Sequence, residues 1–174
     1  MADYSCPNLE LCALRWLRWQ KKCEYALCQR SPRSWTTGIP DVLGVTKSRY
    51  LIEIEIKRSV SDFRADGRKT HRLNRELLLD KQPRQFYYLM PPRLATKLAT
   101  EIPDWAGLMT ADHYSAMVIK DAPLSRESKR LTVKECLRMV KLLSNHLIAA
   151  EESKWNVISR NMVEHDPYYW SYEI

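Results

Sequence analysis

The chain has 174 residues, of which 45% are hydrophobic, enough to bury the core of one domain. Its net charge is +7, and residues 151–174 contribute −3 (two bases, five acids), so residues 1–150 carry +10 and favour polyanionic partners. Four glycines exclude a Gly-rich phosphate loop. No apolar run has membrane-spanning length and the first residues lack a secretory signal, so we expect a cytoplasmic protein without membrane contact.

The beginning of the chain predicts a helix and then a short strand. Apolar side chains recur at helical spacing through residues 8–22, with bases between them. The apolar face contains Leu9, Leu14, Trp16 and Leu17, and the basic face contains Arg15, Arg18, Lys21 and Lys22. The segment CEYAL that follows is typical of a strand.

Two further strands are predicted over residues 40–46 and 50–57. The second contains the alternating run LIEIEIK, which divides its side chains between two faces. One face carries Ile52, Ile54 and Ile56, and the other carries Glu53, Glu55 and Lys57. An exposed edge strand would account for the charged face, and so would a strand that contributes to a catalytic site.

The loop between these two strands decides which residue lies opposite Asp41. If residues 47–48 form the loop, Asp41 lies opposite Ile54 and shares the apolar face. If residues 47–49 form it, or a bulge adds one residue, Asp41 lies opposite Glu55. A lone buried carboxylate is costly, so we favour the second register.

The middle of the chain predicts helices that alternate with strands. Residues 59–81 can begin a helix, with Ser59 or Ser61 as the N-cap. Residues 84–90 form a strand. A short helix started by proline is expected over residues 91–102.

The remaining elements are a hairpin and a long helix. Residues 106–112 and 114–120 are typical of paired strands, and residues 131–155 have the spacing of an amphipathic helix. Its apolar positions are Val133, Leu137, Val140, Leu143 and Leu147. We therefore expect an α/β fold with a mixed central β-sheet flanked by helices. Residues 1–150 would form one domain, and residues 151–174 an acidic aromatic extension.

Asp41, Glu55 and Lys57 form a set suited to phosphodiester hydrolysis. That reaction requires a metal ion to neutralise the phosphate and to make hydroxide from water, with a base or cation that positions the water. Mg²⁺ prefers carboxylate and carbonyl oxygens, and it usually takes one or two protein acids. Asp41 and Glu55 supply such acids, and Lys57 reaches the same space from the same face of the strand.

These residues resemble the motif of the PD-(D/E)XK nuclease superfamily. Pro40–Asp41 is similar to its first half, and Glu55–Lys57 to its second half. The continuation through residue 69, EIKRSVSDFRADGRK, resembles the branch of MmcB-like DNA repair proteins, as does the segment IPDWAGLMTADHYSAMVIKDAP. The resemblance covers residues 38–124, about half the chain.

The resemblance implies a restriction-endonuclease-like core and a particular division of roles. Asp41 and Glu55 would bind Mg²⁺ or Mn²⁺, the backbone carbonyl of Ile56 would be a third ligand, and Lys57 would orient or activate water. An additional acid from an upstream element is common in the family, and Glu24 is the candidate. Two other acids compete for that role, Glu10 and Glu53, although Glu53 is better explained as a solvated neighbour.

A basic run follows the motif. It would contact nucleic-acid phosphates or form a solvated helix face. Its bases are Arg58, Arg64, Arg68, Lys69, Arg72 and Arg75. Four aromatic residues are expected in the core rather than as stacking platforms for bases: Trp35, Phe63, Tyr87 and Tyr88.

The function that these patterns favour is a metal-dependent endonuclease acting on DNA, with RNA as the less favoured substrate. DNA repair, recombination or phage DNA metabolism would be its setting. Two alternatives stay open: a nucleic-acid-binding protein that keeps the nuclease fold without turnover, and a regulator or inhibitor that binds a protein. The sequence also leaves a homodimer open.

Overall fold

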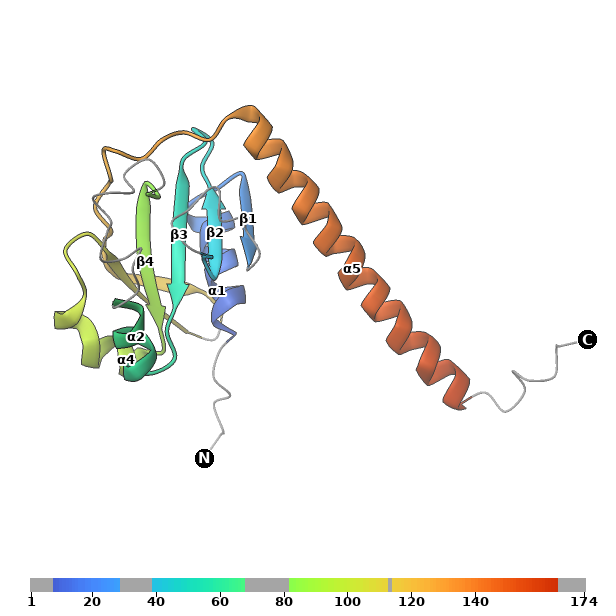
Figure 1. The fold of residues 1–174 in the computed structure, drawn as a ribbon. Helices are drawn as coiled ribbons and strands as arrows, with labels where there is room; N and C mark the ends of the chain where they lie inside the picture. The colour runs from blue at the N-terminus through green and yellow to red at the C-terminus, as the bar shows by residue number, and fades with distance from the viewer. Residues whose placement is uncertain (1–7, 29–38, 68–81, 113, 166–174) are drawn as a thin grey trace, which may run out of the picture. The chain divides into compact units, whose positions relative to one another are not determined.

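The structure is a computed structural model that describes residues 8–28, 39–67, 82–112 and 114–165. Its described strands form one six-stranded sheet in the order β1-β2-β3-β4-β5-β6 (Figure 1). They are β1 (Tyr25–Cys28), β2 (Val42–Val45), β3 (Leu51–Ile56), β4 (Gln85–Met90), β5 (Gly107–Ala111) and β6 (Ala116–Lys120). The β3–β4 and β4–β5 pairs are parallel and the others antiparallel. The predicted α/β class with a mixed sheet is confirmed.

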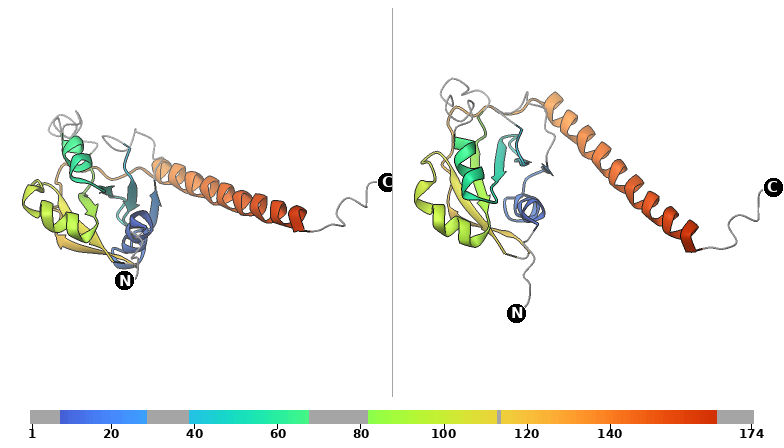
Figure 2. Two further views of the ribbon diagram at one scale, coloured as in Figure 1. Left: turned by 90° about the horizontal axis from the view of Figure 1, so that it is seen from below. Right: turned by 60° about the horizontal axis from the view of Figure 1, so that its bottom comes forward.

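Helices cover both faces of this sheet (Figure 2). Helix α1 (Leu9–Arg15) continues into the π-helical turn η1 (Trp16–Gln20) on one face. On the other face lie α2 (Val60–Gly67) and α4 (Pro92–Leu98), and α4 leads into the 3₁₀ turn η3 (Ala99–Glu101). Apolar clusters fill both layers. The sheet is therefore buried on its two sides, as parallel strands require.

The alternation of β3 and β4 separates the two apolar clusters. Ile54 packs in the cluster under α1, which also contains the predicted inward face of that helix. On β4, Tyr87 joins this cluster, whereas Tyr88 points to the cluster that contains Phe63 from α2. The expectation that Phe63, Tyr87 and Tyr88 are core residues is confirmed. Trp35 lies outside the described residues.

The hairpin between β2 and β3 adopts the favoured register. Val42 lies opposite Ile54, so the pairing carried one step further brings Asp41 opposite Glu55. The loop has three residues and ends at Arg49, whose φ of 65° is left-handed. A turn followed by one left-handed residue is a common three-residue hairpin connection. Local loop geometry thus places Asp41 on the charged face of β3.

Strand β3 is an interior strand, so the edge-strand explanation of its charged face is wrong. It lies between β2 and β4, and its residues are buried throughout. The expectation that Glu53 is solvated is also wrong, because its side chain is 1% exposed. The reason is tertiary: parallel pairing with β4 and the cover of α2 and α4 remove this face from water.

The helix signals in the sequence are confirmed where the structure describes them. Ser59 is the N-cap of α2, and its hydroxyl accepts a hydrogen bond from the Asp62 N–H (3.1 Å). Helix α4 begins with proline at its first position, Pro92. The closing hairpin is the antiparallel pair of β5 and β6.

The division of the chain differs from the predicted one. Helix α5 (Val133–His165) runs without interruption through the boundary expected between residues 150 and 151. The chain instead separates into two compact units, Met1–Val133 and Lys134–Ile174. The apolar positions Leu137 and Leu147 are exposed on α5. Among the described helices, none combines the length and apolar character needed to span a bilayer.

Gly107 is a position where close packing forbids a side chain. A Cβ there would lie 2.4 Å from the Tyr87 ring and 2.7 Å from the Ala122 backbone nitrogen. We expect Gly107→Ala to lower the free energy of unfolding by about 3 kcal/mol, because the backbone neighbour cannot move aside. Gly67→Ala is the matched control, since a Cβ at Gly67 meets nothing within 4 Å. Chemical denaturation of both variants checks this, and equal stabilities would contradict it.

Candidate active site

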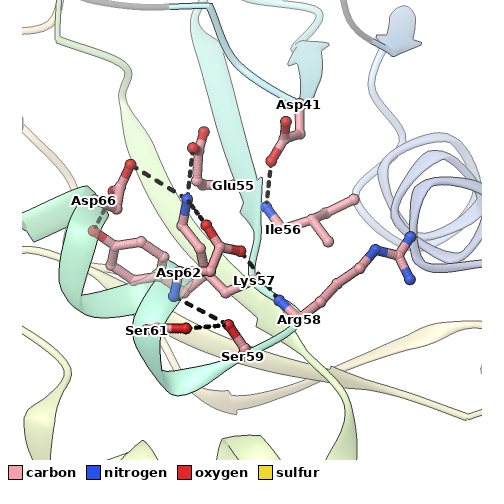
Figure 3. A network of polar contacts seen from close by, with 10 residues as sticks. Asp41, Glu55, Ile56, Lys57, Arg58, Ser59, Ser61, Asp62 and Asp66 are labelled. Carbon is pink, nitrogen blue, oxygen red and sulfur yellow. Dashed lines mark hydrogen bonds and ion pairs between the residues drawn. The ribbon is translucent and has the colours of Figure 1, made fainter.

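Asp41 and Glu55 meet where β2 begins and β3 ends. The Ile56 N–H donates to Asp41 Oδ2 at 2.7 Å, which holds this carboxylate beside the end of β3 (Figure 3). Glu55 is 4% exposed. Both acids therefore lie on one end of the antiparallel pair, as the register requires.

Lys57 is a buried cation at the same place. Its backbone N–H donates to the Leu89 carbonyl (3.0 Å), which extends the pairing of β3 with β4 by one residue. Its side chain is 3% exposed, and Nζ lies 2.9 Å from Glu55 Oε1. The same ammonium lies 3.3 Å from Asp66 Oδ1 and 3.8 Å from Asp62 Oδ1. Carboxylates from β3 and α2 thus converge on one ammonium.

Two further residues belong to this site, Asp66, which the sequence pattern did not single out, and Tyr88, which was expected only in the core. Asp66 is 0% exposed, and the Tyr88 hydroxyl donates to its Oδ2 at 3.0 Å. Asp62 and Asp66 are four residues apart, a spacing that puts both on one face of α2. That spacing, directly after the Glu55–Lys57 motif, was a signal that could have identified them as partners of Lys57.

Burial and neighbouring acids change the ionisation of Glu55. Loss of solvent, and after it the charge of Asp41, raise the pKa of Glu55, whereas Lys57 lowers it, and the net result is a pKa of about 7. In Figure 3 the Lys57 ammonium faces the carboxylates of Glu55, Asp62 and Asp66, and the Asp41 carboxylate lies at the nearby Ile56 N–H. This local excess of negative charge favours a cation.

The predicted additional ligand, Glu24, does not join this group. Its N–H donates to the Val45 carbonyl (2.8 Å), so it lies at the other end of β2 from Asp41. Its competitor Glu10 shares a neighbour with Asp41: burial, and then the charges of Glu10 and Asp41, raise the pKa of Cys28 to about 11.

No group of three or more His, Cys, Asp and Glu side chains within the described ranges is placed to hold a metal ion. The metal-ligand set proposed from the sequence consists of two acidic side chains, Asp41 and Glu55, and the backbone carbonyl of Ile56. Such a set matches the one or two protein acids that Mg²⁺ usually takes, with water and substrate in the other positions.

The predicted phosphate contacts have different surroundings. Arg58 is exposed. Arg64 forms a two-pronged ion pair with Glu101 of η3 (3.0 and 3.2 Å), which occupies its guanidinium within the protein. The other four, Arg68, Lys69, Arg72 and Arg75, lie outside the described residues.

Comparison with known proteins adds information on the fold alone. No protein family model and no curated protein matches the sequence. The SPO1766 protein of unknown function from Silicibacter pomeroyi has a similar structure, with a TM-score of 0.54 and 19% sequence identity. The match covers 97% of this chain and 97% of that chain. An identity this low supports a shared α/β fold and carries no function.

The raised pKa of Glu55 predicts a particular pH dependence of stability. The folded-state value of about 7 lies above the ordinary 4.5, so stability present at low pH is lost as pH rises from 4.5 to 7. We expect a loss of at most about 3 kcal/mol across this window.

Denaturation in EDTA at several pH values measures this dependence. Glu55→Gln should remove the loss of stability between pH 4.5 and 7. The control, Glu152→Gln at an exposed position of α5, should retain this loss. A wild-type profile in the Glu55→Gln protein would show that another group titrates.

Proposed function

We propose that this chain is a divalent-metal-dependent endonuclease that hydrolyses phosphodiester bonds in DNA, in DNA repair, recombination or phage DNA metabolism. The observation that carries the proposal is the meeting of Asp41, Glu55 and Lys57 at one end of the β2–β3 pair. Acid, acid and lysine in this arrangement are the groups that metal-assisted phosphodiester hydrolysis uses. The charge of +10 over residues 1–150 supports a polyanionic substrate.

The donor set fits Mg²⁺ or Mn²⁺. Asp41 and Glu55 would hold the ion, and the Ile56 carbonyl would be the third protein ligand. The fit rests on the Glu55 carboxyl. Burial and the charge of Asp41 raise its pKa, because the two carboxylates repel each other when both are ionised. A bound divalent cation would relieve this repulsion. When bound, such an ion neutralises phosphate charge and makes hydroxide available from water near neutral pH.

Lys57 would orient the attacking water and stabilise the charge that develops on the phosphate. In the structure its ammonium contacts both Glu55 and Asp66. Asp66 would therefore remain a partner for Lys57 when the Glu55 carboxylate binds the metal ion. Tyr88 orients Asp66 through its hydroxyl, so that β4 and α2 together hold the lysine at the end of β3.

A direct experiment incubates the purified protein with linear, nicked, single-stranded and four-way DNA, each with Mg²⁺, Mn²⁺ or EDTA. Cleavage is expected with the divalent ions and absent in EDTA. RNA substrates of the same shapes measure the preference for DNA. If no substrate is cut with any ion and calorimetry detects no divalent binding, the nuclease proposal gives way to binding without turnover or to a regulatory role.

Substitutions separate the roles of the three residues. Asp41→Asn and Glu55→Gln should abolish cleavage and weaken metal binding, while DNA binding in EDTA persists or improves as repulsion of phosphate is relieved. Lys57→Ala should retain metal binding and lose about 10²-fold or more in single-turnover rate, as when one electrostatic contact to the transition state is removed. Asp104→Asn, on an exposed loop, is the control and should behave as wild type.

A further inference from the structure

Three chain segments form a corner at the start of β3, the end of the sheet away from α2 (Figure 1). We call residues 46–50, 82–84 and 121–131 the Tyr50 corner. Two backbone hydrogen bonds join these segments, from the Ser125 N–H to the Arg84 carbonyl (2.9 Å) and from the Leu131 N–H to the Arg49 carbonyl (2.8 Å), and a third, from the Arg84 N–H to the Leu51 carbonyl (2.8 Å), attaches them to β3. Because these hydrogen bonds join segments that are distant in the sequence, the fold fixes the backbone of the corner.

Two arginines share the Tyr50 ring at this corner. The guanidinium carbons of Arg84 and Arg130 lie 5.1 and 5.3 Å from the ring centroid. Arg130 Nε donates to the Tyr50 hydroxyl (3.2 Å), and Arg84 donates to the Ser125 carbonyl (2.6 Å). Each guanidinium is thus oriented by one hydrogen bond and one aromatic contact.

This arrangement keeps two like charges close together. Among the described residues, no carboxylate forms an ion pair with Arg84 or Arg130. A guanidinium carries five N–H donors in a planar fork that suits phosphate, and only one on each arginine has a hydrogen bond within the described part of the chain. An anion bound here would relieve the repulsion and use the remaining donors.

The charge of the Tyr50 corner extends beyond this pair. It contains six bases and two acids. The bases are Lys47, Arg49, Arg84, Arg126, Lys129 and Arg130, and the acids are Asp121 and Glu127. The bases are distributed over three segments rather than directed at one point, so a linear chain of phosphates fits them better than a single small anion.

We propose that the Tyr50 corner is a second nucleic-acid contact, which binds backbone phosphates outside the candidate active site. Tyr50 precedes β3 and Ile56 ends it, so a six-residue strand of about 20 Å separates the two places. The corner therefore binds nucleic acid away from the cut position. As a contact for the substrate it rests on the proposed nuclease function, but the binding itself is measured without metal.

The test compares binding of labelled single-stranded and duplex DNA in EDTA across a series of NaCl concentrations, by fluorescence anisotropy. Arg84→Gln/Arg130→Gln should weaken duplex binding roughly tenfold per lost contact near 0.1 M salt, and lower the salt slope by about 0.9 per contact. Arg130→Gln alone keeps the Arg84 bond to Ser125 and should lose one contact. It keeps the test valid if the double variant fails to fold.

The matched control is Arg15→Gln. It removes one arginine that also stacks on an aromatic ring, Trp19, at 5.7 Å, and that donates to the Tyr114 carbonyl between β5 and β6, outside the Tyr50 corner. This control should retain the wild-type slope. A wild-type slope in the corner variants, or an equal loss in the control, overturns the proposal.

Competition distinguishes nucleic acid from other anions. Inorganic phosphate at millimolar concentration and polyglutamate should displace DNA poorly. Efficient displacement by phosphate identifies a small-anion site, and efficient displacement by polyglutamate an acidic protein partner; either overturns the proposal. Corner-dependent binding without metal-dependent cleavage refutes the nuclease function alone, whereas cleavage without corner dependence refutes the corner alone.

Discussion

The burial of one ammonium group constrains the centre of this protein. Lys57 is 3% exposed, and a cation removed from water is tolerated only where carboxylates receive it. Glu55 and Asp66 do so at 2.9 and 3.3 Å. Glu55 belongs to the same strand, but Asp66 comes from α2. The position of that helix against the sheet is therefore tied to the lysine.

Several local features cooperate to make this contact. The backbone of Lys57 continues the pairing with β4 through Leu89, so its side chain has a defined direction. Ser59 caps α2 two residues later, and the helix then carries Asp66 back to the sheet. Tyr88, the neighbour of Glu55 across the parallel pair, completes the network through Asp66. Each part is held by another, which gives the group one geometry in a layer shielded from water.

The two ends of β3 have opposite electrostatic character. At its end, Glu55 and Asp66 contact one buried lysine and Asp41 lies at the Ile56 N–H, and the pKa of Glu55 is raised to about 7 because burial and Asp41 disfavour its charge. At its start, Arg84 and Arg130 share one tyrosine ring. An acidic site that attracts a cation needs separate basic surfaces to hold a polyanion, since phosphates are repelled by the carboxylates themselves. In the proposed function, the six-residue strand β3 would separate an acidic site for the metal ion from a basic surface for the polyanion.

The sequence by itself determined the elements near the candidate site, because each depends on residues close in the chain. Alternation defined the two faces of LIEIEIK, the cost of a lone buried carboxylate selected the register of Asp41, and Ser59 was a recognisable cap. Only the tertiary structure decided that β3 is an interior strand. Its second neighbour, β4, follows after a helix, and the alternation of apolar residues along a strand does not show which strands will pair. It also decided that Asp66 contacts Lys57, that Arg64 pairs with Glu101, and that Arg130 reaches Tyr50, eighty residues away. Such partners are set by packing between distant segments, and no local pattern records which side chains that packing brings together.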